Sequence, residues 1–259
     1  MRNKKEERIN EENHNNQGCL MKIIEYNNNN NIVVEFQDKY KTMVRTQYGA
    51  FKRGEVKNPY YPAVCGIGIV GNKYPVRENN KVVKEYVAWH NMIKRCYYEK
   101  YHEKQATYKE AMCCKEWLFY ENFYEWLHNQ DNFDMWHDGD RWAIDKDIIK
   151  KGNKVYSPEY CCLVPQNVNS LFVKGNKSRG VLPIGVTRHK NKFAAQCQNQ
   201  ITGELEVLVT HNTPEEAFQT YKKYKENIIK QVAEVEFNKR NITIECYNAM
   251  MSYQVDITD

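Results

Sequence analysis

The sequence lacks both features that would place the protein in a membrane or outside the cell, and it lacks one common metal-binding pattern. It has no run of about 18 apolar residues, which a membrane-spanning helix needs, so a membrane span is excluded. Its first residues are polar and contain no apolar signal-peptide core. It also has no Cys-x-x-Cys pair, so the usual zinc-ribbon spacing is missing. The first two absences predict a cytoplasmic protein without a membrane partner.

Nine cysteines are nevertheless present, and two adjacent pairs occur at Cys113-Cys114 and Cys161-Cys162. Adjacent cysteines rarely bridge each other. In a cytoplasmic chain such residues usually serve as small apolar side chains. We therefore expect reduced, mostly buried thiols; the alternative is a metal or redox role.

Charge is nearly balanced, with 38 Lys and Arg against 33 Asp and Glu and a net charge of +5 over 259 residues. The hydrophobic fraction of 41% is ordinary for a soluble protein. Cations nevertheless gather in residues 174–192, where no acid occurs: Lys174, Lys177, Arg179, Arg188, Lys190 and Lys192. Such placement is compatible with nucleic-acid binding.

We expect an α+β protein that begins with a disordered polar tail over residues 1–20 and a small β-rich domain over 21–80. Strands are predicted at 22–26, 31–36 and 43–46, with an Asn-rich turn at 27–31 between the first two. Basic and aromatic residues alternate along residues 40–57, which suits either a second nucleic-acid contact or an ordinary surface. The glycines at 65–71 lack the Lys-Ser/Thr of a phosphate loop and indicate a turn.

Helical periodicity begins near residue 86. One face collects Trp89, Met92, Ile93, Cys96 and Tyr97. A second helix is predicted at 116–128, with Phe119, Phe123 and Trp126 on one face. Aromatic stripes of this kind are usually core, so the two helices are expected to form a platform for the segment that follows.

Residues 144–172 are the most informative part of the chain. They predict a strand that ends at Asp145, a hairpin loop, a second strand and a short helix that contains Asn169. An acid and an amide oxygen that converge in this way suit a hard divalent cation beside a phosphate. The residue after the acid is Lys146, whose pKa would need to fall by about three units for it to act as a base at neutral pH.

The last part predicts three short strands, at 184–189, 193–198 and 205–209, followed by a helix. Thr213 supplies an N-cap, Pro214 the first helical position, and Glu215 and Glu216 acids in the first turn. Apolar side chains are expected to face inward and lysines outward: Ala217, Phe218, Tyr221, Ile228 and Val232 against Lys222, Lys223, Lys225 and Lys230. A final amphipathic stretch covers residues 244–255.

Residues 86–172 resemble phage-encoded HNH endonucleases, many of which are homing enzymes. The matching residues follow the family order: Trp89, Met92, Arg95, Cys96, Tyr97, Cys114, Glu116, Trp117, Phe123, Trp126, Ile144, Asp145, Lys146, Asp147, Tyr156, Pro158 and Cys161. The resemblance implies an HNH-like ββα module over 81–175.

This resemblance also implies a site. Asp145 and Asn169 would hold Mg²⁺ or another divalent cation, and Lys146 stands where the family has its general-base His. Tyr160 replaces the Asn that orients that base. Lys146 is then a base or a phosphate clamp, Asp147 a catalytic or a structural carboxylate, and His137 a substitute base or a surface-loop residue.

Residues 179–234 resemble the APETALA2/ethylene-response-factor DNA-binding domain. The resemblance rests on Arg179-Gly180, Gly185-Val186, Phe193-Ala194, Thr213 to Ala217, and Tyr221. It implies a domain over 176–259 whose sheet lies in the major groove of double-stranded DNA. The matching strand residues are Arg179, Arg188, Lys190, Lys192, Gln196 and Gln198.

The sequence therefore predicts a cytoplasmic DNA-binding protein of a phage-infected or lysogenic bacterial host. In the first hypothesis it is of the HNH endonuclease type and nicks or cleaves double-stranded DNA by metal-assisted hydrolysis. In the second it is catalytically inactive: a DNA-binding regulator, or an anti-CRISPR-like anti-defence protein that binds a host defence protein or nucleoprotein complex.

Overall fold

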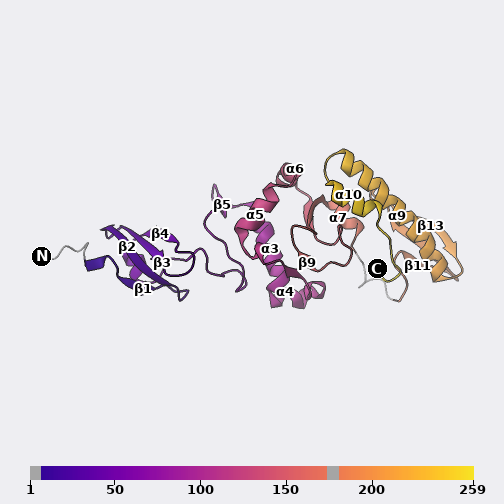
Figure 1. Ribbon diagram of the computed structural model, residues 1–259. Helices are drawn as coiled ribbons and strands as arrows, with labels where there is room; N and C mark the ends of the chain where they lie inside the picture. Colours follow the sequence, from indigo (N-terminus) through magenta and orange to yellow (C-terminus); the bar gives the residue numbers. More distant parts are fainter. Residues whose placement is uncertain (1–6, 174–180) are drawn as a thin grey trace. The chain divides into compact units, whose positions relative to one another are not determined.

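The computed structural model describes residues 7–173 and 181–259. As expected, the chain is a mixed α+β protein with several small sheets (Figure 1). None of the helices in the described ranges is long and apolar enough to cross a membrane. The chain divides into two compact units. The first runs to Lys109 and includes Cys113–Glu125; the second comprises Glu110–Met112 and Trp126–Asp259.

The first unit opens with a four-stranded antiparallel sheet in the order β1-β2-β3-β4. The strands are β1 (Glu12–His14), β2 (Leu20–Asn28), β3 (Asn31–Phe36) and β4 (Met43–Thr46), and the short helix α2 (Tyr48–Lys52) follows. Alternate residues of β2 and β3 are fully buried, and Phe51 of α2 completes their core. The three strands predicted in this region are confirmed.

The expectation of a disordered tail over residues 1–20 is wrong for its second half. Strand β1 pairs with β2, and the buried Asn15 organises the loop that joins them. The Asn15 Oδ1 accepts the backbone N–H groups of Gln17 and Cys19 at 3.0 and 2.8 Å, and its Nδ2 donates to the Val56 carbonyl at 2.8 Å. A polar side chain that satisfies backbone groups orders a segment that composition alone marks as disordered.

The rest of the first unit is mostly helical and packs around aromatic side chains. Its elements are β5 (Arg77–Glu78), β6 (Lys81–Val82), α3 (Lys84–Tyr97), α4 (Glu99–Lys104), η1 (Ala106–Tyr108) and η2 (Glu116–Leu118). Strand β7 (Met112–Cys113) and helix α5 (Tyr120–His128) each have residues in both units. Trp89 and Trp117 are buried, and the Trp89 Nε1–H donates to the Trp117 carbonyl at 2.8 Å. On the predicted face of α3, Trp89, Met92, Ile93 and Cys96 are buried and Tyr97 is half-buried. Of the aromatic stripe predicted to be core, Phe123 is buried, and Phe119 and Trp126 are half-buried.

The second unit holds the segment singled out in the sequence and the C-terminal sheet. Its elements are α6 (Phe133–Asp138), β8 (Trp142–Asp145), β9 (Val155–Tyr156), β10 (Cys162–Pro165), α7 (Gln166–Leu171), β11 (Val186–His189), β12 (Lys192–Gln198), β13 (Leu205–His211), α9 (Pro214–Asn238) and α10 (Ile244–Met251). Strands β11, β12 and β13 form an antiparallel sheet in chain order. Figure 1 shows α9 as the long helix beside β11 and β13.

One hydrophobic core runs through this unit. It joins Val164 of β10 and Val168 of α7 to Ala195 of the sheet, Phe218 of α9 and Met250 of α10. The predicted division between residues 175 and 176 is therefore not a boundary between separate cores. The three-domain division of the chain otherwise stays a prediction.

All nine cysteines lie in the described ranges and all are free thiols. Six are buried: Cys96, Cys113, Cys161, Cys162, Cys197 and Cys246. A hydrogen bond with the Cys246 thiol, together with burial, holds the pKa of Cys162 well above its ordinary value. Burial also raises the pKa of Cys197. The prediction of reduced, mostly buried thiols is confirmed.

Candidate metal centre and nucleic-acid interface

Strands β8 and β10 and helix α7 have the strand–loop–strand–helix order that the sequence predicts. The two strands are antiparallel, with Asp145 opposite Cys162 and Trp142 opposite Pro165. Strand β10 runs directly into α7, which carries Asn169. Asp145 thus lies at the start of the long loop between the two strands.

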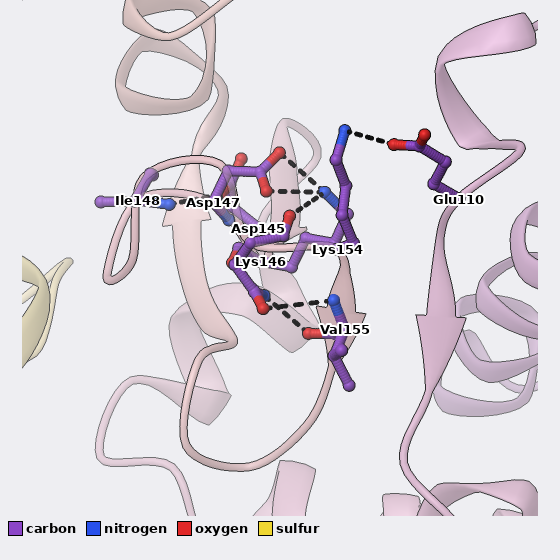
Figure 2. Close-up of polar contacts among 8 residues, drawn as sticks. Glu110, Asp145, Lys146, Asp147, Ile148, Lys154 and Val155 are labelled. Atoms are coloured by element: carbon purple, nitrogen blue, oxygen red, sulfur yellow. Dashed lines mark hydrogen bonds and ion pairs between the residues drawn. The ribbon is translucent and has the colours of Figure 1, made fainter.

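The Asp145 carboxylate caps the turn that follows β8. Its Oδ1 accepts the backbone N–H groups of Asp147 at 2.7 Å and Ile148 at 3.0 Å (Figure 2). Burial of the carboxyl raises its pKa, and these two hydrogen bonds oppose the rise. One carboxylate oxygen is therefore committed to the backbone, which leaves Oδ2 as the atom that a cation could use.

Lys146 is buried, and its ammonium group is fully engaged inside the loop. Nζ donates to both carboxylate oxygens of Asp147, each at 2.7 Å, and to the Asn153 carbonyl at 3.0 Å. Figure 2 shows the Lys146 amine directed at the Asp147 carboxylate. All three donors of the ammonium are directed at acceptors inside the loop, whereas a general base must point at the proton that it removes.

Asn153 closes the same loop from its other end. Its Nδ2 donates to the Lys146 carbonyl at 2.8 Å and to the Val155 carbonyl at 2.7 Å. Its Oδ1 accepts the Val155 N–H at 3.2 Å. Lys154 next to it lies 3.5 Å from the Glu110 carboxylate. The geometry of the loop thus comes from Lys146, Asp147 and Asn153 together. No pattern in the sequence marks Asn153, because only its side-chain hydrogen bonds reveal its role.

The two other predicted residues of this site lie on helices. His137 is in α6 rather than in a surface loop; its side chain is exposed and its Nδ1 lies 2.9 Å from the Asp138 carboxylate. Asn169 is half-buried on α7. Over residues 7–173 and 181–259, no three His, Cys, Asp or Glu side chains are grouped to hold a metal ion. The oxygen atoms that could serve are the Asp145 Oδ2 and the Asn169 Oδ1.

The C-terminal sheet has one covered and one open face. Val186, Ala195 and Cys197 point into the core beneath α9. Strand alternation therefore directs their neighbours away from the helix. We call this open side the outer face; its residues are Thr187, His189, Lys192, Ala194, Gln196, Gln198, Leu205, Val207 and Thr210.

Three of the predicted DNA-binding residues, Lys192, Gln196 and Gln198, lie together on the outer face. Lys190 is exposed in the turn between β11 and β12, where it adopts a φ of +53°. Arg188 pairs with Phe193 across the strands, on the side of α9, and its guanidinium lies 5.4 Å from the centre of the Phe193 ring. Arg179 falls outside the described residues.

The electrostatics of the outer face are uniform in sign. None of its nine residues is acidic; the exposed cations of the β11–β12 turn adjoin one end of it, and the exposed Glu204 of the β12–β13 turn flanks the other. The nearest strand acid, Glu206, pairs with Cys197 on the covered side. There it accepts hydrogen bonds from Tyr224 at 2.5 Å and Asn199 at 2.7 Å, and the Tyr224 bond lowers its pKa.

Sequence reasoning did not identify the exposed apolar part of the outer face. The side chains of Leu205 and Val207 are 58% and 64% exposed. The alternation of side chains along a strand could have identified it. Leu208 packs against the core, so Val207 beside it points to the opposite face of the sheet.

Cations of the N-terminal sheet are largely neutralised by their neighbours. Four of them lie near a carboxylate: Lys41 at 3.7 Å from Glu35, Arg45 at 3.7 Å from Glu25, Lys52 at 2.8 Å from Glu11 and Arg53 at 2.8 Å from Glu55. Such exposed pairs contribute little to stability. They do reduce the positive field that a second nucleic-acid contact would need.

The glycine-rich loop after residue 65 surrounds a protein carboxylate. The Glu121 Oε1 accepts the backbone N–H groups of Asn72 at 2.9 Å and Lys73 at 2.8 Å. A Cβ atom on Gly71 would lie 2.2 Å from that oxygen. The loop is a turn, as predicted, and the two amide groups that follow Gly71 are occupied by Glu121.

No protein-family model, curated protein or solved structure matches this chain. The HNH-like and APETALA2-like resemblances therefore rest on the sequence motifs alone.

Proposed function

We propose that this protein binds double-stranded DNA and is of the HNH endonuclease type, with its C-terminal sheet as the main DNA contact. The observation that carries the proposal is the outer face: an open antiparallel sheet, free of acids and bordered by Lys190 and Lys192. A β-ribbon of this width fits the major groove, and cations at its end can contact phosphates.

Any reaction at the β8–β10–α7 segment would be metal-assisted phosphodiester hydrolysis. If a Mg²⁺ ion binds there, Asp145 Oδ2 and Asn169 Oδ1 would be its oxygen donors; Mg²⁺ commonly takes one or two protein ligands and completes its shell with water and phosphate. The bound cation would polarise the phosphate and lower the pKa of a water molecule. His137 is the remaining candidate for a base, because the ammonium of Lys146 is held by Asp147.

The second candidate function is a non-catalytic binder: a DNA-binding regulator or an anti-defence protein that docks on a host complex. The engagement of Lys146 favours it. The residue in the position of the family's general base stabilises the loop, with three acceptors around its Nζ. In this view the nuclease scaffold is retained for binding.

Binding is tested by fluorescence anisotropy with a labelled duplex over a range of salt concentrations. Affinity should fall steeply with salt, because phosphate contacts release counterions. The Lys190→Gln/Lys192→Gln variant should reduce the log–log salt slope by about two, since each phosphate contact contributes about one.

Lys230→Gln is the matched control, because Lys230 is equally exposed but lies on α9. It should leave the slope unchanged. Absence of duplex binding at low salt would falsify the proposal.

Catalysis is tested separately by incubating supercoiled plasmid with Mg²⁺ or Mn²⁺. If the site is active, nicked circles should form with the native protein and be absent with Asp145→Asn and Asn169→Ala. Asp145→Asn keeps an oxygen for the two backbone N–H groups but removes the charge. Glu159→Gln, an exposed acid of the same loop, is the control. No nicking with any metal, alongside intact DNA binding, assigns the protein to the non-catalytic class.

A further inference from the structure

The outer face combines amide and apolar side chains in a fixed geometry. Gln196 on β12 pairs directly with Val207 on β13, and Gln198 pairs with Leu205. Side chains paired across antiparallel strands have Cβ atoms about 5 Å apart and point the same way. Each pair therefore presents a hydrogen-bonding amide and an exposed apolar group side by side.

The two amides differ in their freedom. Gln198 donates one of its two Nε2–H groups to the Gly203 carbonyl at 2.7 Å, which ties its amide to the β12–β13 turn. Gln196 accepts only a long hydrogen bond, 3.4 Å from the Thr187 hydroxyl to its Oε1. A bond of that length is weak. Both amides keep a donor and an acceptor, and Gln196, which no turn holds, is the freer of the two to reorient towards a base.

This combination matches one base pair in the major groove. Adenine presents the N7 acceptor beside the N6 amino donor, which a glutamine amide can bind in a bidentate manner. Its partner thymine presents the C5-methyl group on the same edge, which binds apolar side chains. G·C pairs offer neither combination.

We infer that the outer face selects A·T base pairs, with Gln196 binding adenine and Val207 and Leu205 contacting thymine methyl groups. This inference rests on the proposed DNA-binding function. It explains why two large apolar side chains are exposed on a face that is otherwise polar and basic. The charge of this surface favours a DNA duplex over a protein strand as its partner. The adjoining β11–β12 turn supplies cations, and the outer face has no carboxylate that would repel phosphates.

The test compares three duplexes of equal length and salt: one rich in A·T pairs, the same duplex with deoxyuridine in place of thymidine, and one of G·C pairs only. Uracil lacks the C5-methyl group and keeps every hydrogen-bonding atom. The native protein should bind the uracil duplex about fourfold more weakly for each thymine methyl group that it touches in the A·T duplex. Its affinity for the G·C duplex should be at least about tenfold lower than for the A·T duplex.

Variants connect these preferences to the named side chains. Val207→Ala and Leu205→Ala should reduce the thymine-over-uracil preference, and Gln196→Ala should reduce the A·T-over-G·C preference. These residues lie outside the core, so the fold is expected to survive. Val235→Ala and Gln231→Ala on the exposed side of α9 are the matched controls and should change neither preference.

The outcomes separate the two proposals. If no duplex binds, the proposed function fails and this inference fails with it. If all three duplexes bind equally, the DNA-binding function stands and the selection of A·T pairs is overturned. If Val207→Ala converts a dimer to a monomer in sedimentation and leaves the preference intact, the apolar side chains bind a second copy of the chain, and the inference is again overturned.

Discussion

At the scale of single residues, Lys225 is the clearest departure from the sequence pattern. We expected it to face outward from α9, but it is only 7% exposed. It follows Tyr221 by four positions and precedes Ile229 by four, so it lies on the same buried row of the helix. Burial lowers the pKa of its amine, and the nearby Cys197 thiol opposes the effect.

This burial predicts the effect of Lys225→Met. A lowered amine pKa means that the folded state disfavours the charged form. The destabilisation is therefore fully present below the folded-state pKa and disappears as pH rises to the ordinary lysine value. Lys225→Met should raise the free energy of unfolding at neutral pH by about 1 kcal/mol, and the gain should shrink towards alkaline pH. Urea unfolding across pH measures it; the exposed Lys223→Met is the control, and a gain independent of pH contradicts the reason given.

At the scale of elements, the N-terminus of α9 is the best-specified feature of the chain. The Thr213 hydroxyl accepts the Glu216 N–H, and the Glu216 carboxylate accepts the Thr213 N–H, both at 3.3 Å. This reciprocal arrangement is a capping box. Thr213→Ala should lower the free energy of unfolding by about 1 kcal/mol. Thr213→Ser should leave it nearly unchanged in the same denaturation experiment, and equal losses in both would show that the hydroxyl is not responsible.

The elements also show where sequence reasoning succeeds and fails. Helix α9 was predictable because its cap and its apolar period are local. The helix predicted at 116–128 is instead interrupted at Phe119, which has extended backbone angles. The reason is a distant contact: Ile69 donates its N–H to the Leu118 carbonyl and accepts the Tyr120 N–H. Local periodicity carries no information about such a contact. The prediction that Phe119 lies on one face of a continuous helix is therefore wrong.

The candidate site also has a part that the sequence predicts and a part that it does not. The order of strand, loop, strand and helix, and the positions of Asp145 and Asn169, follow from local pattern. The burial of Lys146 against Asp147 does not, because adjacent charged residues usually remain in solvent. What the sequence could not provide is the fold of the loop, in which Asn153 and Lys146 hold each other through backbone carbonyls.

At the scale of the whole molecule, the shared core of the second unit predicts which fragments fold. A fragment over residues 176–259 contains the complete C-terminal sheet and α9, but it lacks the apolar residues of β10 and α7 that pack against them. It should show a broad, low-temperature unfolding transition by circular dichroism. A fragment over residues 110–259 retains the core and should unfold cooperatively. Equal, sharp transitions would show that residues 176–259 form an independent domain.

The reactivity of the nine free thiols can be used to measure how often the folded protein opens. Six are covered in the native state, and the raised pKa values of Cys162 and Cys197 leave little reactive thiolate. A thiol-specific chromogenic reagent should therefore label the six buried thiols of the folded protein slowly and all nine thiols of the denatured protein. The rate at which the last thiols react then reports how often the interior opens to solvent, without any introduced label.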